Sequence, residues 1–286
     1  MNLRAYAKIN IGLRVLDKRP DGFHNIETIF HEIDLFDELT FEPGETISLT
    51  SPSPVVPTDE RNLCVLAAVS FRKRTGGREG VKMTLKKNIP VGAGLGGGSS
   101  DAAAVLVALN RMWNASLDTA DLAALAATLG SDVPFFIQGG TAFGTSRGEK
   151  LESIELKIPF WILTVTPPVH VSTSWAYSCV NPRGRPSRED PRSLVTKALA
   201  HPSRLAATVK NDFEEPVFSA HSEIRSLKER LISLGALFAQ MSGSGSSVFG
   251  FFPDEHSAHK AKDACGAPLA TSLTHPDFKA DRRVHQ

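Results

Sequence analysis

The feature that most constrains this chain is a glycine-rich segment, Pro90–Ser100, in which five glycines fall within seven residues. Asp101 follows it and opens an apolar run with helical spacing, made by Ala102, Val105, Leu106, Leu109 and Trp113. Because glycine has no Cβ, the backbone of such a segment can adopt positive φ and approach a ligand closely. A glycine loop that leads into a helix presents free N–H groups at the positive end of the helix dipole. The segment therefore predicts a phosphate-binding site.

Three interpretations of Pro90–Ser100 compete. A flexible surface turn is the commonest use of clustered glycines, but here a strand precedes the loop and a helix follows it. Gly92–Gly97 also matches the pattern of dinucleotide-binding folds, whose first strand is buried on both faces and nearly all apolar. Val81–Lys86, the preceding strand, alternates apolar and polar residues, which disfavours a nicotinamide-dependent oxidoreductase. A nucleoside triphosphate loop remains, although no lysine precedes Ser99 or Ser100 as it would in a Walker A loop.

The composition limits the classes of partner. A chain of 286 residues with 41% hydrophobic and 22% charged residues is globular in composition, and it is long enough for one large domain or two ordinary ones. The net charge of +1 indicates neither a nucleic-acid nor a membrane partner. Three widely separated cysteines are typical of a reducing compartment. Because we find no apolar run with the length of a signal peptide or a membrane span, we expect a cytoplasmic protein.

Two shorter segments before the glycine loop carry candidate functional residues. Lys8 and Asn10 lie two apart in a predicted strand at Leu3–Leu16, so both side chains point to the same face. An edge strand with its polar side chains in water is the alternative interpretation. Asp21–His24 is a turn by composition, and His24 alone would more often be an exposed loop histidine.

Two segments after the glycine loop complete the set. Asp132 stands two residues before Pro134, which is typical of a helix start, so a capping aspartate is the simplest interpretation. The apolar residues Val133, Phe135 and Phe136 would also shield a reactive carboxylate from water. A second Gly/Ser loop, Ser242–Ser247, lies between two predicted strands. Two such loops can close on one phosphate chain from both sides, which a dinucleotide-binding fold does not need.

The predicted strands and helices are mixed in both halves of the chain, which indicates an α+β protein. A strand at Phe160–Val165 begins the second half. We place the domain boundary between residues 155 and 156, with an N-terminal ATP-binding lobe at 1–155 and a C-terminal lobe at 156–286.

In order and rough spacing, the motifs resemble those of the GHMP kinases, a family of ATP-dependent small-molecule kinases. The resemblance rests on Ala7–Ile11, Asp21–His24, Pro90–Ser100, Gly130–Phe135 and Met241–Gly245, and so covers nearly the whole chain. It implies the two-lobed GHMP fold, with an N-terminal lobe like domain 2 of ribosomal protein S5 and an α/β-sandwich C-terminal lobe. The pattern is most similar to that of a member whose substrate is a small molecule bearing a cytidine diphosphate group.

The resemblance also implies roles for individual residues. Lys8 and Asp132 would be catalytic, with Asp132 taking the proton of the acceptor hydroxyl. The ATP-binding residues would be Pro90, Val91, Gly92, Ala93, Gly94, Leu95, Gly96, Gly97, Gly98, Ser99, Ser100, Gly243, Ser244 and Gly245. The residues that bind the second substrate would be Asn10, Phe23, His24, Thr173 and Tyr177. Mg²⁺ is expected to accompany ATP, and the resemblance assigns it no protein ligand.

Several alternatives stay open at this point. The chain could be another GHMP kinase, such as a homoserine kinase, or a nucleotide-binding protein without catalysis, which the presence of both Lys8 and Asp132 disfavours. Phe23 stands where the family commonly has tyrosine, so it keeps a stacking face and lacks the hydroxyl. Trp175 competes with Tyr177 as the second aromatic residue that stacks on the base. A monomer or weak homodimer is expected.

Overall fold

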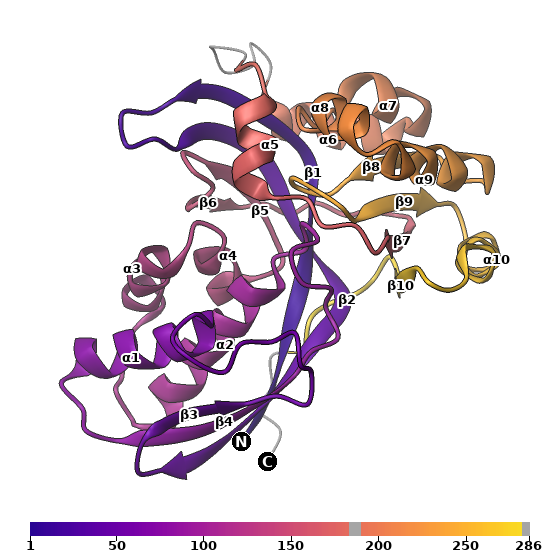
Figure 1. The fold of residues 1–286 in the computed structure, drawn as a ribbon. Helices are drawn as coiled ribbons and strands as arrows, with labels where there is room; N and C mark the ends of the chain where they lie inside the picture. Colours follow the sequence, from indigo (N-terminus) through magenta and orange to yellow (C-terminus); the bar gives the residue numbers. More distant parts are fainter. Residues whose placement is uncertain (183–189, 282–286) are drawn as a thin grey trace.

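The computed structural model describes residues 1–182 and 190–281, which form two β-sheets with helices packed against them (Figure 1). The first sheet has six strands, in the order β3-β4-β2-β5-β6 with β1 also paired to β2. Its strands are β1 (Asn2–Lys18), β2 (His24–Gly44), β3 (Ile47–Thr50), β4 (Gly80–Lys86), β5 (Thr141–Thr145) and β6 (Lys150–Ser153). All its pairings are antiparallel except that of β3 with β4.

Four helices pack together with the first sheet: α1 (Leu63–Thr75), α2 (Gly97–Met112), α3 (Thr119–Leu129) and α4 (Val133–Gln138). They lie on the same side of the long β1–β2 pair in Figure 1. The side chain of Asn62 accepts a hydrogen bond from the Cys64 N–H and so caps α1, which ends at Gly76 in the left-handed conformation. Local signals of the sequence therefore set both ends of this helix.

The second sheet has four antiparallel strands in the order β10-β7-β9-β8. These are β7 (Trp161–Thr166), β8 (Phe238–Met241), β9 (Val248–Phe252) and β10 (Ala270–Thr274). Its helices are α5 (Thr173–Cys179), α6 (Pro191–Ala200), α7 (Leu205–Thr208), α8 (Glu214–Ala220), α9 (Ser222–Ser233) and α10 (Glu255–Cys265), and a 3₁₀ turn (Pro202–Arg204) precedes α7. The α+β class and the two-sheet architecture are as predicted.

A shared hydrophobic core joins the two sheets. Ala7, Ile9 and Ile11 of β1 belong to the same buried cluster as Phe249 and Phe251 of β9. Because side chains alternate along a strand, Lys8 and Asn10 must point the other way, toward the first lobe. The polar edge-strand interpretation is therefore wrong: Lys8 is 3% exposed and Asn10 2%.

Some sequence expectations fail in detail. The spacing of apolar residues in 62–74 predicts Leu66 in the buried stripe of a helix, but in α1 Leu66 is exposed, while Cys64, Val65 and Ala68 are buried beside Phe71. The segment 44–58, rich in Ser, Pro and Thr, indicates a hairpin and loop, but it contributes β3, which α1 connects to β4 and which pairs with β4 in parallel. The helices α5, α8 and α10 were not expected. Two of them have only seven residues, and α10 buries small side chains, so periodicity signals them weakly.

Candidate active site

One cavity of about 1130 Å³ lies between the two lobes. Residues of the first sheet, the glycine loop, α5 and the second Gly/Ser loop all line it. Among the predicted site residues, those that line it are Lys8, Asn10, Phe23, His24, Pro90, Val91, Gly92, Ala93, Gly94, Gly96, Gly97, Gly98, Ser99, Asp132, Thr173, Tyr177, Gly243 and Ser244. Segments that lie more than two hundred residues apart in the sequence thus line the same cavity.

The glycine loop leads directly into α2 and has the backbone conformation that glycine permits. Gly92, Gly94 and Gly96 have φ values of +67°, +78° and +71°. A Cβ on Gly96 would collide with the ring of Phe136 and crowd the Lys8 side chain, and one on Gly94 would overlap the Ser242 carbonyl. The glycines therefore permit close contacts with the second lobe as well as exposing N–H groups to the cavity.

Three residues predicted to bind ATP do not line the cavity. Leu95 is buried in the core shared by the two sheets. Ser100 is buried in the first turn of α2, where its N–H donates to the Gly96 carbonyl. Gly245 is a buried residue of the second loop, and a Cβ on it would collide with the Met241 side chain. A sequence motif identifies a whole loop, but only the residues on the side of the loop that faces the cavity can contact a ligand there.

The Lys8 ammonium group has three oxygen neighbours. It donates hydrogen bonds to Asn10 Oδ1 at 2.6 Å and to the Gly94 carbonyl at 3.1 Å, and it lies 3.3 Å from Asp132 Oδ2. The Asn10 amide donates in turn to Thr28 Oγ1 at 3.0 Å. Two hydrogen bonds thus hold the Lys8 ammonium group, and an ion pair joins it to the Asp132 carboxylate, which stays about one-third exposed.

Asp132 precedes α4 but does not cap it with its side chain. The backbone of Asp132 is already helical, at φ −85° and ψ −17°, and its carboxylate accepts no hydrogen bond from the N–H groups of α4. The capping interpretation is therefore wrong. The same carboxylate pairs with Lys8, and Val133, Phe135 and Phe136, which follow it in the chain, are buried.

The second Gly/Ser loop is tied to the first by hydrogen bonds. Ser242 Oγ donates to the Gly94 carbonyl at 2.9 Å and accepts from the Asn10 N–H at 3.2 Å. The Ser247 N–H donates to the Ala93 carbonyl at 3.1 Å. Gly243 and Ser244 reach the cavity, where Ser244 Oγ lies 3.0 Å from Thr173 Oγ1. The two loops therefore form one continuous wall.

His24 and Tyr177 form an aromatic pair at the far end of the cavity. Their rings are stacked with centroids 5.1 Å apart and planes 15° apart, although they come from β2 and from α5, which lie side by side in Figure 1. Trp175 instead meets His221 edge-on and is not among the described residues that line the cavity. Of the two competing aromatic residues, the structure thus places Tyr177 in the cavity.

Burial shifts the ionisation of both rings. It lowers the pKa of His24, and the nearby Lys18 lowers it further, so the neutral imidazole is favoured. Burial raises the pKa of Tyr177, and the charge of Asp132 adds to that effect, so the phenol stays protonated. Both rings are therefore uncharged faces suited to stacking on a base.

A buried ionic cluster behind the glycine loop was not predicted. Lys87 makes ion pairs with Asp37 and with Asp101, the latter at 2.8 Å, and Lys87 and Asp101 both line the cavity. Burial and the negative charge of Asp37 raise the pKa of Asp101 to about 8, against the opposing effect of Lys87. Nothing in the sequence distinguished Asp37 from the other acidic residues of β2, such as Asp34 and Glu38.

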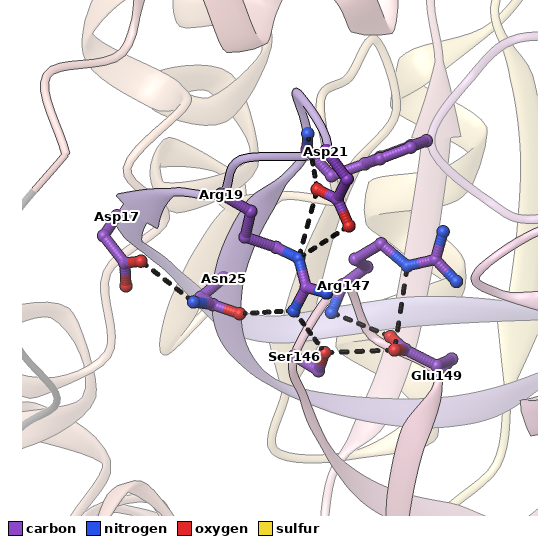
Figure 2. A network of polar contacts seen from close by, with 8 residues as sticks. Asp17, Arg19, Asp21, Asn25, Ser146, Arg147 and Glu149 are labelled. Carbon is purple, nitrogen blue, oxygen red and sulfur yellow. Dashed lines mark hydrogen bonds and ion pairs between the residues drawn. The ribbon is translucent and has the colours of Figure 1, made fainter.

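A second unpredicted cluster joins the turn before β2 to the turn between β5 and β6 (Figure 2). Arg19 donates to both carboxylate oxygens of Asp21, and to Ser146 Oγ at 2.9 Å. Glu149 accepts from the Ser146 hydroxyl and from the Arg147 N–H. Nothing in the sequence distinguished Arg147 from any other turn arginine, yet its side chain lines the cavity.

Comparison with known proteins agrees with this geometry. The family models for the GHMP kinase N-terminal and C-terminal domains match residues 62–140 and 196–271. A 4-diphosphocytidyl-2-C-methyl-D-erythritol kinase of Chlorobium limicola is 44% identical over 99% of both chains. The corresponding kinase of Prosthecochloris aestuarii is 42% identical over 97% of this chain and 98% of its own. The chain belongs to the 4-diphosphocytidyl-2-C-methyl-D-erythritol kinases, within the GHMP kinases.

Solved structures of GHMP kinases have the same fold. A crystal structure of a 4-(cytidine 5′-diphospho)-2C-methyl-D-erythritol kinase superposes with a TM-score of 0.81 at 36% identity, covering 96% of this chain and 98% of the other. A homoserine kinase from Cytophaga hutchinsonii reaches a TM-score of 0.70 at 18% identity, with 96% and 95% covered, and shows the fold alone. As a GHMP kinase, the protein is an ATP-dependent phosphotransferase. Within residues 1–182 and 190–281, no helix has the length and apolar character needed to cross a membrane.

Proposed function

We propose that the protein transfers the γ-phosphoryl group of ATP to the 2-hydroxyl of 4-diphosphocytidyl-2-C-methyl-D-erythritol, a step of non-mevalonate isoprenoid precursor biosynthesis. Family membership supports the reaction class and the substrate. The single observation that carries the mechanism is the Lys8–Asp132 pair in the wall of the cavity, between the glycine loop and the His24–Tyr177 pair.

In this mechanism Asp132 accepts the proton of the 2-hydroxyl as its oxygen forms a bond to the γ-phosphorus. The bond from that phosphorus to the bridging oxygen breaks at the same stage, and ADP leaves with the electron pair. Lys8 stabilises the charge that develops on the attacking oxygen, and Asn10 holds Lys8 in place through its side-chain oxygen. Phosphoryl transfer depends mainly on such positioning and charge stabilisation.

The loop residues would bind the phosphates of ATP. N–H groups at the start of α2 and the wall formed by Gly243 and Ser244 face the same part of the cavity. At the other end, His24 and Tyr177 would stack on the cytosine, with Phe23, Asn10 and Thr173 as further contacts. The lobes at 1–155 and 156–286 would supply the two walls, and the two family models fall one in each.

Mg²⁺ fits this site as an ion carried by ATP. Among the described residues no group of three histidine, cysteine, aspartate or glutamate side chains could hold a metal. Of the cavity carboxylates, Asp101 is buried and paired with Lys87, whereas Asp132 is paired with Lys8 through one oxygen and stays about one-third exposed. One or two carboxylates together with substrate phosphates are the usual ligands of Mg²⁺. When bound, the ion would neutralise phosphate charge.

The test is to incubate the purified protein with ATP, Mg²⁺ and a panel of alcohols and to follow ADP release. The panel contains 4-diphosphocytidyl-2-C-methyl-D-erythritol, homoserine and mevalonate. The proposal predicts saturable, substrate-dependent ADP release with the cytidyl substrate and only the background rate with the others. Release that depends on homoserine or mevalonate instead would contradict it.

A further inference from the structure

Arg147 occupies a particular place in the wall of the cavity. Its neighbour Ser146 accepts a hydrogen bond through its carbonyl from the Ile26 N–H at 2.7 Å, two residues after His24. On its other side lies Gly148, where a Cβ would stand 3.8 Å from Asp132 Oδ1. The turn thus extends from the aromatic pair to the Asp132 carboxylate, and Arg147 is the residue in between.

The Arg147 guanidinium is held in position, and its hydrogen-bonding capacity is unused. Its central carbon lies 4.9 Å from the centroid of the Phe23 ring, so the ring supports it by a cation–π contact. Nε is buried and forms an ion pair with Glu149 Oε1 at 3.7 Å, a distance too long for a hydrogen bond. Within residues 1–182 and 190–281, the guanidinium donates no hydrogen bond, and its terminal nitrogens lie on the side away from Arg19 and Ser146 in Figure 2.

The neighbouring carboxylates are already engaged, so they do not neutralise Arg147 through hydrogen bonds to its guanidinium. Asp21 is bound by Arg19 through both oxygens, and it also accepts from the Phe23 N–H. Glu149 accepts from the Ser146 hydroxyl and from the backbone of Arg147 itself. The network in Figure 2 therefore shapes the turn and leaves a planar cation facing the cavity.

We propose that Arg147 binds the diphosphate of the cytidyl substrate and thereby fixes the distance between the base and the reacting hydroxyl. The proposal rests on the proposed function. In a cytidine diphosphate ester the diphosphate stands between the nucleoside and the alcohol, as Arg147 stands between His24 and Asp132. The guanidinium fork can contact phosphate oxygens through two parallel N–H donors. Of the other cavity cations, Lys8 pairs with Asp132, Lys87 with Asp37 and Asp101, and Arg61 with Asp59.

Lys18 is the competing cation. It also lines the cavity, and it pairs with His24 across the β1–β2 ladder, so it lies at the base end. A lysine there would add a point charge near the nucleoside. Arg147, by contrast, directly precedes Gly148, which lies beside the Asp132 carboxylate. The two cations therefore predict different results when each is removed.

The experiment measures binding of CDP and of cytidine by calorimetry to the wild type, Arg147→Met, Arg147→Lys and Lys18→Met, with the exposed Arg74→Met as a control for net charge. We expect Arg147→Met to weaken CDP binding by about 10- to 100-fold, the typical effect of losing hydrogen bonds to a charged group. Cytidine binding should change by less than about 2-fold, and Arg147→Lys should be intermediate because it keeps the charge without the fork. The KM for the cytidyl substrate should rise in parallel.

The outcomes separate this inference from the proposed function. If the wild type prefers CDP to cytidine and phosphorylates the cytidyl substrate, while Arg147→Met keeps that preference at its wild-type melting temperature, the diphosphate assignment is wrong. Loss of the preference in Lys18→Met alone would assign the diphosphate to Lys18 and overturn the proposal. A wild type that shows neither CDP binding nor the activity overturns both.

Discussion

The two ends of the cavity are built from different parts of the chain. Around the glycine loop, backbone groups of Gly92–Gly98 form the wall, and a second loop and a buried ionic cluster support it from behind. Around the His24–Tyr177 pair, the wall consists of side chains on turns and on a short helix, and Phe23 is 51% exposed. Backbone N–H groups are suited to binding phosphates, which are the same in every ATP molecule. Side chains differ in shape and polarity, so they can distinguish one alcohol substrate from another. We therefore expect side-chain changes to affect the alcohol, and only added bulk in the loop to affect ATP.

The largest expected effect is at the Lys8–Asp132 pair, where the two ends meet. Asp132→Asn keeps the shape of the side chain and removes the proton acceptor, so kcat should fall by about 10²–10⁴-fold, the usual contribution of a general base. ATP affinity, measured by calorimetry, should stay at the wild-type value. An Asp132→Asn enzyme with nearly normal kcat would contradict the assignment.

The second test adds bulk to the glycine loop. A Cβ on Gly98 would meet only Leu63 Cδ1 at 3.8 Å, so a side chain is tolerated by the protein itself and would project into the cavity. Gly98→Val should therefore keep the melting temperature and weaken ATP binding by about 1–3 kcal/mol, as overpacking does. Gly98→Ala is the matched smaller change and should weaken it less. If Gly98→Val binds ATP as well as the wild type, the phosphates do not lie against this turn of α2.

The third test truncates the aromatic pair. Stacking of a base on an aromatic ring contributes about 1–3 kcal/mol, so His24→Ala and Tyr177→Ala should each raise the KM for the cytidyl substrate by roughly 5- to 150-fold. ATP affinity should be unchanged, because His24 begins β2 and Tyr177 lies in α5, so neither residue belongs to the glycine loop or to the second Gly/Ser loop. Trp175→Ala is the matched control, since that ring faces His221. A KM that stays at the wild-type value in both cavity variants would place the base elsewhere.

The smallest expected effect concerns pH and the buried cluster behind the loop. Because the folded-state pKa of Asp101 is raised to about 8, the native state binds its proton more tightly than the unfolded state does. Its contribution to stability is therefore present at low pH and is lost as the pH rises between about pH 4 and pH 8. Asp101→Asn has no such proton, so the free energy of unfolding of the wild type should fall relative to this variant over that range. A constant difference would show that Asp101 is ionised in the native protein throughout.

The sequence predicted those parts of the site whose chemistry is contiguous. The glycine loop was recognised from its local pattern, whereas Lys8, Asn10 and Asp132 were assigned through the resemblance of their short motifs to those of the GHMP kinases, and all of them line the cavity. Residues that depend on pairing between distant segments were missed. Asp37 and Lys87 lie fifty residues apart, and only the register of β2 with β4 brings them together. Arg147 lies in the cavity wall because its turn packs against Ile26 and Asp132. Sequence periodicity gives no information on such a contact between distant segments.

The fold shows the same division. The long strands and α2 carry strong periodicity and were predicted, whereas α5, which supplies Thr173 and Tyr177, is seven residues long and was not. The prediction that Thr173 and Tyr177 bind the substrate came from the resemblance to the GHMP kinases and not from the pattern of α5, and both residues line the cavity. Short helices are stabilised by tertiary packing more than by their own sequence. In α5 this packing includes the contacts of Tyr177 with Phe213 and His24.

The measurement that tests the account most directly is a double-mutant cycle on kcat with Lys8→Met, Asp132→Asn and the double variant, using ATP and the cytidyl substrate. The 3.3 Å contact between Lys8 Nζ and Asp132 Oδ2 implies that the two groups act on one proton transfer. We therefore predict that each single variant is severely impaired and that the double variant is little worse than the worse single one, because residues that act as a unit are not additive. Losses that multiply fully in the double variant, with ATP affinity intact in all three, would show that Lys8 and Asp132 act at separate steps.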